Sequence, residues 1–388
     1  MRIKLNKDSY LKCTFIILML HPLQRCISSL INSFIYFPKI GHYLMGSFYL
    51  SVLLYAFFII LFNKFSKKRL IYFIVGVLFW IFAYIFSVDT REYFNSSEVK
   101  IICTFYMPLS IFVVSNVKNW KDLFRNKFYV FGADFLILFS FLSKVVNPER
   151  SDYMSYSYNL LPFWCLVLIA ALHNKKRLQW IFVFLGFVQG IFYGSRGAIL
   201  WLVMCGVLVS CLQFFHKNGL KKLIKSFIGL GVITLVGKLV FPILMETSIV
   251  SKSYILRRIQ SGNLSSSSGR DILFEECLNI LANMNFNIYG LFYDRTVLSN
   301  GWYSHNLIFE VFISFGWLLG FIFLFVLFLY LILICFNQNK ERKIVFIFLS
   351  CSLFFRYFLS GSIFDEGNFW IFLGAIASLK NFRIKLGR

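Results

Sequence analysis

The chain has 388 residues, of which 59% are hydrophobic and 20% aromatic, and its formal net charge is +23. Average soluble domains are about 45–50% apolar, so this composition excludes an ordinary soluble domain. The apolar residues come in runs of about 20, the length of a membrane-crossing helix, and not in the alternating ten-residue segments of an outer-membrane barrel. The sequence therefore predicts an all-α, polytopic membrane protein.

About twelve such runs follow one another, and we expect residues 1–388 to form a single integral membrane domain. The runs lie near residues 12–37, 43–62, 70–88, 99–117, 127–146, 157–173, 178–194, 197–215, 226–245, 311–336, 344–360 and 368–380. The first is interrupted by His21-Pro22-Leu23-Gln24-Arg25, which favours a kink or a broken helix there.

The charges between the runs alternate in sign along the chain. Basic residues gather at 64–69, 118–127, 175–177, 217–225, 340–343 and both termini, and the acids of the other connections are Asp89, Glu92, Glu98, Glu149, Asp152, Asp365 and Glu366. Lys and Arg in short loops stay on the cytoplasmic side, so we expect both termini in the cytoplasm. This distribution explains the net charge without a nucleic-acid partner.

The long polar segment 246–305 is then extracytoplasmic, and its basic and acidic residues balance. Arg270-Asp271 opens a stretch whose apolar residues recur at helical spacing up to Met284. We expect an amphipathic helix on the outer membrane surface, capped by Ser268 or Gly269, after a flexible Ser- and Gly-rich tract at 261–269. Tyr289-Gly290 is expected to turn the chain toward His305.

Three short motifs meet on this outer side. They are the turn Gly194-Ser195-Arg196-Gly197, the helix start Ser268-Gly269-Arg270, and Ser304-His305-Asn306 followed by Glu310, which enters the span where Gly316 to Gly320 are expected to pack. Simpler interpretations stay open for each. Arg196 suits a snorkelling anchor, His305 a polar cap, and Arg257 and Arg258 contacts with anionic lipid.

The order and spacing of these motifs resemble the O-antigen polymerase and O-antigen ligase superfamily of bacterial polysaccharide assembly. The resemblance covers about residues 180 to 335 by motif, and the whole chain by span number and topology. It implies a GT-C-like membrane fold. It also implies that Arg196, Arg270 and His305 are the catalytic positions, because they match the turn arginine, the loop arginine and the loop histidine of the family pattern.

Members of this superfamily transfer a glycan from undecaprenyl diphosphate to an acceptor hydroxyl, and the leaving diphosphate requires fixed cations. Arginines suit this role because a guanidinium grips phosphate oxygens through paired hydrogen bonds. His305 would accept the hydroxyl proton or, if protonated, hold the diphosphate. We expect substrate contacts from Arg257, Arg258, Arg356 and Glu310. Arg356 and Lys238 lie within predicted spans, where charges are uncommon.

The predicted function is therefore polymerisation of undecaprenyl-diphosphate-linked repeat units of O-antigen or capsule at the bacterial inner (plasma) membrane. A metal ion and a cofactor are not expected, since no Asp-x-Asp pair or Cys/His spacing suggests a metal site. Beyond the lipid-linked donor and acceptor, the expected partners are membrane lipid and a chain-length regulator. The alternatives are a ligase that moves glycan to lipid A core and a non-catalytic transporter or flippase. A transporter would place its polar residues at the midplane and show two related halves.

Overall fold

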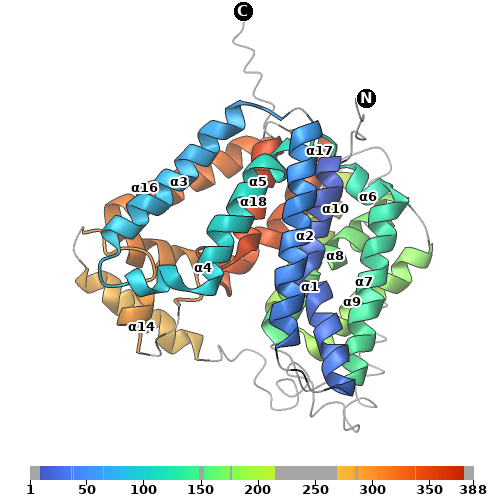
Figure 1. The fold of residues 1–388 in the computed structure, drawn as a ribbon, viewed down its shortest axis with the longest axis horizontal. Coiled ribbons are helices and arrows are strands. Elements are labelled where there is room, and N and C mark those ends of the chain that lie inside the picture. The colour runs from blue at the N-terminus through green and yellow to red at the C-terminus, as the bar shows by residue number, and fades with distance from the viewer. Residues whose placement is uncertain are drawn as a thin grey trace, which may run out of the picture.

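The computed structural model describes residues 9–214 and 269–379, apart from 36, 38, 64, 148–152, 175–176, 285–286, 300, 302 and 337. These residues form helices and connecting segments, without a strand in the described ranges (Figure 1). The helices are α1 (Ser9–Phe34), α2 (Ile40–Phe62), α3 (Lys68–Phe86), η1 (Arg91–Asn95), α4 (Ser97–Ile101), η2 (Ile102–Tyr106), α5 (Met107–Phe112), η3 (Val114–Asn116), α6 (Asp122–Arg125), α7 (Lys127–Val146), α8 (Tyr153–Asn174), α9 (Arg177–Tyr193), α10 (Arg196–Phe214), α14 (Arg270–Asn283), α15 (Asp294–Val297), α16 (Leu307–Phe336), α17 (Lys340–Leu349), η4 (Ser350–Phe354), η5 (Phe355–Phe358) and α18 (Gly367–Leu379).

The described helices are those of a multi-pass membrane protein. Seven of them are long and apolar enough to cross a bilayer, and they correspond to the predicted runs near 12–37, 43–62, 70–88, 99–117, 127–146, 157–173 and 311–336. The runs near 178–194, 197–215 and 368–380 form shorter apolar helices. The run near 226–245 lies outside the described residues, as do Lys238, Arg257, Arg258 and the tract 261–268. A total of twelve spans stays a prediction.

Two predicted spans differ in detail. The first was expected to kink or break near Pro22, and it does not break, because α1 continues through this proline as one helix. Pro22 removes a single hydrogen bond, and α1 packs against both α2 and α7, which hold its two sides. The run 344–360 is instead interrupted, because α17 passes into the π-helical turn η4 and then into the 3₁₀ turn η5. This irregular end brings Arg356 into the protein.

Burial separates central helices from peripheral ones. In α8, 83% of the most apolar stretch is buried inside the protein, compared with 11% in α3. The helices α1, α7, α9 and α10 surround α8. In contrast, α2 and α3 are apolar on all sides and mostly exposed, which is expected of helices that face lipid. The same hydrophobic core includes residues from α1 to α18.

One end of the bundle collects basic connections. Glu341 pairs with Arg125 at 2.7 Å and with Lys121 at 3.6 Å. The guanidinium of Arg69 donates to the carbonyl oxygen of Ala377 at 3.3 Å, and the Trp120 indole donates to the Ser378 hydroxyl at 2.6 Å. We call this end, made by residues 65–69, 115–127, 338–343 and 377–379, the basic end.

The opposite end collects the acidic connections. Arg295 forms an ion pair with Asp365, and Arg356 with Glu366 at 2.8 Å. The hydroxyl of Thr90 donates to the Leu291 carbonyl oxygen at 2.6 Å. We call this end, made by residues 87–98, 153–158, 194–197, 269–306 and 355–367, the acidic end. The assignment of the basic end to the cytoplasm and the acidic end to the outside stays a prediction.

The helix α16 bends sharply at Gly316, a residue expected to pack within a continuous span. Gly316 has φ 70° and ψ 177°, a conformation that only glycine adopts readily. The freed carbonyl oxygen of Ser314 accepts the N–H groups of Tyr289 and Gly290, at 3.2 and 2.8 Å. A Cβ at Gly320 would lie 2.8 Å from Phe312, so the two arms of the bend pack tightly. The packing expectation holds for Gly320, and Gly316 makes the bend itself.

The amphipathic helix of the long polar segment forms as predicted, from Arg270, with Gly269 at its N-cap in a left-handed conformation. Its expected position on the outer membrane surface stays a prediction, and the structure adds what its apolar stripe contacts. Leu273, Cys277 and Leu281 are buried against Leu298 and Ile313. The indole of Trp317 donates to the Leu281 carbonyl oxygen at 3.1 Å. The apolar stripe of α14 therefore packs on the first arm of α16.

Candidate functional site

The turn between α9 and α10 places Arg196 beside α8. The hydroxyl of Ser195 accepts from the N–H of Ala198 at 3.3 Å, which caps α10, and its oxygen lies 3.0 Å from the Ser157 hydroxyl oxygen. A Cβ at Gly197 would lie 2.2 Å from the phenol oxygen of Tyr158. Ser195 and Gly197, the two sequence neighbours of Arg196, thus both contact α8. The half-buried Arg196 is the first residue of α10 and lies beside this contact.

Arg270 begins α14 and points to the same end of α8. One of its terminal nitrogens lies 3.8 Å from the sulfur of Met154, and the Ser360 hydroxyl lies 3.4 Å from that sulfur. The phenol of Tyr158 is within electrostatic range of Arg270 and Arg356. Residues 154–158 of α8 therefore connect the start of α14 with the segment that follows η5.

His305 lies in the connection before α16, in a strained backbone conformation with φ 54°. Its side chain is 8% exposed, and its ring centre lies 4.1 Å from that of Tyr303. Burial, together with the smaller effect of the nearby positive charge of Arg270, lowers the pKa of His305 to about 4. The imidazole is therefore neutral at pH 7 and able to accept a proton.

Tyr303 and Ser360 complete this part of the site. Burial raises the pKa of Tyr303 to about 12, and its hydroxyl is hydrogen-bonded to Ser360. The phenol therefore keeps its proton and its capacity to donate. Arg270, Met154, Ser360, Tyr303 and His305 form a continuous polar group, which we call the His–Arg cluster.

Arg356 lies next to the His–Arg cluster, but its charge is already balanced. It is 5% exposed, pairs with Glu366 at 2.8 Å, and stacks over the Tyr158 ring at 4.5 Å from the ring centre. The carboxylate and the aromatic ring offset part of the cost of removing the Arg356 charge from water. The Arg356 guanidinium lies near Tyr158 and Tyr303. Because Glu366 neutralises it, Arg356 adds less positive charge to the site than the sequence implied.

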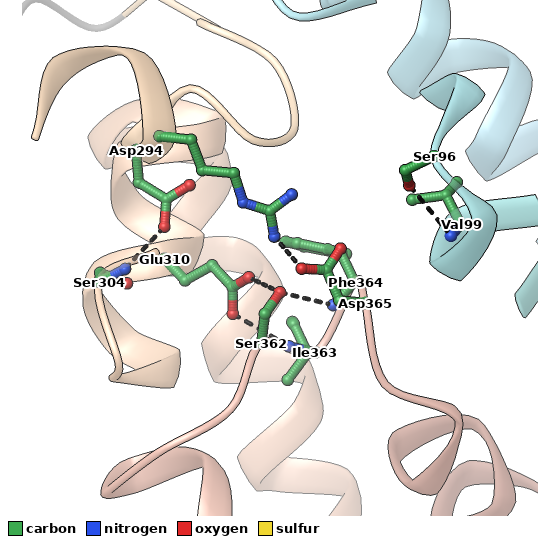
Figure 2. A network of polar contacts seen from close by, with 10 residues as sticks. Ser96, Val99, Asp294, Ser304, Glu310, Ser362, Ile363, Phe364 and Asp365 are labelled. Carbon is green, nitrogen blue, oxygen red and sulfur yellow. Dashed lines mark hydrogen bonds and ion pairs between the residues drawn. The ribbon is translucent and has the colours of Figure 1, made fainter. Parts of the chain in front are cut away.

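Glu310 belongs to a second network that holds the His305 loop (Figure 2). Its two carboxylate oxygens accept the Ser362 hydroxyl and the N–H of Ile363, the latter at 3.1 Å. It is 2% exposed. Glu310 thus ties the start of α16 to the segment that leads into α18, and its expected contact with substrate stays a prediction.

Asp294 of α15 fixes the other side of the same loop. Its carboxylate accepts the N–H of Ser304 at 2.9 Å, one residue before His305. Burial raises the pKa of Asp294 to about 6, against the lowering effects of that hydrogen bond and of Arg295. The Asn306 side chain donates to the Phe358 carbonyl oxygen at 3.1 Å. His305 is therefore held from both neighbouring residues.

An open groove of about 630 Å³ runs along α14 from Ile272 to Met284. Its lining includes Glu275, Glu276 and Asn279, and also Tyr289 and Tyr293, whose rings stack 4.8 Å apart. Arg270 lies at the start of the same helix, so the groove extends away from the His–Arg cluster.

No family model, curated protein or solved structure matches the chain. The superfamily resemblance therefore rests on the motifs themselves. Among the described residues, no group of three or more His, Cys, Asp or Glu side chains is placed to hold a metal ion.

Sequence reasoning identified Arg270, His305 and Arg356, which the structure brings to one end of α8, and Arg196, whose backbone adjoins the same site. It missed Tyr158, Asp294, Ser362 and the role of Glu366. Asp294 and Glu366 had a detectable signal, because acids are uncommon in this apolar chain. Tyr158 and Ser362 had none, since their partners lie far away in sequence.

Proposed function

We propose that the protein is a metal-independent glycosyltransferase that polymerises undecaprenyl-diphosphate-linked repeat units at the outer face of a bacterial plasma membrane. The proposal is carried by the proximity of Arg270 to a neutral, buried His305. It is supported by the superfamily resemblance of the three motifs, whose elements adjoin one another at the acidic end.

In this reaction, an acceptor hydroxyl attacks the anomeric carbon of the donor sugar, and the bond from that carbon to the diphosphate oxygen breaks. The hydroxyl proton passes to neutral His305, and the diphosphate leaves with its negative charge. Arg270 and Arg196 stabilise that charge as it develops. With its lowered pKa, His305 suits a proton acceptor better than a cationic diphosphate ligand.

Two grooves suit the other parts of such a substrate. The groove along α14 offers stacked tyrosines with carboxylate and amide groups, which suit the faces and hydroxyls of sugar rings. An apolar groove of about 460 Å³ between α3, α16 and α18 includes Phe79, Phe315 and Phe323. It suits the polyprenyl tail.

The test uses Arg196→Ala, Arg270→Ala and His305→Ala, each measured for membrane level and for glycan chain length on a gel. We expect losses of at least about 10²-fold in polymerisation for Arg270→Ala and His305→Ala, the usual scale for removing such a group. Arg91→Ala is the matched control. Arg91 lies at the same end of the protein, but its guanidinium stacks over the Tyr84 ring and is not part of the proposed site. If all three variants still build long chains, the proposed site is wrong.

A variant that builds long lipid-linked chains but fails to attach them would favour the ligase instead. Purified protein with a synthetic lipid-linked repeat unit separates the two directly, because only a polymerase lengthens the donor glycan in the absence of lipid A core.

A further inference from the structure

A cavity of about 560 Å³ opens at the basic end, far from the His–Arg cluster along the helices. Four separate parts of the chain contribute to its lining: Ser66 and Arg69, residues 115–121, four residues between Asn339 and Val345, and residues 378–379. They come from the start of α3, the connection before α6, the start of α17 and the end of α18. We call this cavity the basic pocket.

The basic pocket has an excess of positive charge. Arg69, Lys118, Lys121 and Arg342 line it against a single carboxylate, Glu341. That carboxylate also pairs with Arg125, which is not part of the lining, at 2.7 Å. A concave site with four cations and one shared acid attracts anions more strongly than dispersed surface cations do.

The pocket also holds an unused buried donor. The terminal nitrogen of Arg69 donates to the Ala377 carbonyl oxygen at 3.3 Å, which orients the guanidinium. Its Nε is buried and has no hydrogen-bond partner among the described residues. Buried polar groups are almost always paired, so this donor implies an acceptor that enters the pocket.

We propose that the basic pocket binds the phosphate group of an anionic ligand. Phosphate oxygens match the fork of Arg69 and the charges of Lys118 and Arg342. The pocket lies at the ends of apolar helices, where the headgroup of an anionic phospholipid would meet it. A soluble phosphate compound supplies the same chemistry, and the test distinguishes the two sources.

The test measures thermal unfolding of the full-length protein in phosphatidylcholine nanodiscs, with either phosphatidylglycerol added to the lipid or inorganic pyrophosphate added to the buffer. We expect at least one probe to raise the unfolding temperature. In Arg69→Gln/Arg342→Gln, the probe concentration at half effect should rise about fivefold per cation removed, or about 25-fold in total. Each variant is compared with its own probe-free unfolding temperature, so a less stable fold does not obscure binding.

The matched control is Lys67→Gln/Lys127→Gln, which removes two exposed cations at the same end that do not line the pocket. Arg69→Lys keeps the charge without the Nε donor and should lose less than Arg69→Gln. Stabilisation by phosphatidylglycerol alone identifies a lipid, and stabilisation by pyrophosphate identifies a soluble ligand. The proposal is overturned if neither probe stabilises the protein, or if the control variant loses as much of the effect as the pocket variant.

Discussion

At the scale of single residues, the environment of His305 decides its chemistry. The imidazole is buried beside Tyr303 and within range of Arg270, and both burial and the arginine disfavour a positive charge on it. The motif Ser-His-Asn predicted that His305 matters, but its protonation state depends on burial and on a charge from another helix. The sequence alone predicts neither how deeply a side chain is buried nor which distant charge lies beside it.

We expect His305 to titrate near pH 4 and to stay neutral above it. In Arg270→Gln the midpoint should rise but remain below 6.5, because burial persists when the charge is removed. The imidazole NMR signals of the five histidines report this directly, with His305→Ala used for assignment. A midpoint near 6.5 in the unmodified protein, or no change in Arg270→Gln, would contradict the proximity of the two groups.

The same lowered pKa links folding to pH. The unfolded chain binds a proton at His305 near pH 6.5, whereas the folded chain does so only near pH 4. The contribution of His305 to stability is therefore fully present above pH 6.5 and is lost as the pH falls toward 4.

At the scale of elements, hydropathy located the apolar helices but not their irregularities. Pro22 is a strong breaker in sequence, yet α1 continues through it because neighbouring helices hold both sides. Gly316 looked like a packing residue, yet it bends α16, and the N–H groups of Tyr289 and Gly290 donate to the freed Ser314 carbonyl oxygen. Tertiary partners decided both cases, and apolar periodicity contains no information about them.

We expect Gly316→Ala to lower the free energy of unfolding by about 1–3 kcal/mol, since alanine is strained at its backbone angles. Gly46 provides the control, because it lies inside α2 with open space around the position of a Cβ. Gly46→Ala should be neutral or stabilise by up to about 1 kcal/mol. Thermal unfolding in detergent measures both. Equal effects of the two substitutions would show that the bend has no special conformational requirement.

At the scale of the whole molecule, alternating charge in the sequence becomes two chemically distinct ends. The positive-inside pattern grouped the loops as the structure groups them, because ion pairs such as Arg125–Glu341 and Arg295–Asp365 join loops of the same predicted side. The arrangement of the helices around α8 was not predictable, since most apolar helices here have no distinct polar face.

We expect the basic end in the cytoplasm and the acidic end outside. Single cysteines at Asn119 and Glu275, both exposed, test this with a membrane-impermeant maleimide on intact spheroplasts. Glu275→Cys should react at once, and Asn119→Cys only after the membrane is opened. The unsubstituted chain gives the background from its nine native cysteines, all of them free thiols. The reverse labelling pattern would place the His–Arg cluster on the cytoplasmic side.

The bend at Gly316 also affects how deep the two arms of α16 can lie in a bilayer. A straight helix of the 30 residues of α16 would be about 45 Å long, well beyond the roughly 30 Å of a bilayer's hydrocarbon layer. The arm from 317 to 336 is about 30 Å long and suffices to cross it. We therefore expect the arm before Gly316 to lie at headgroup level, together with His305 and the start of α14. At that depth, a diphosphate attached to a membrane-anchored tail would reach Arg270 without leaving its leaflet.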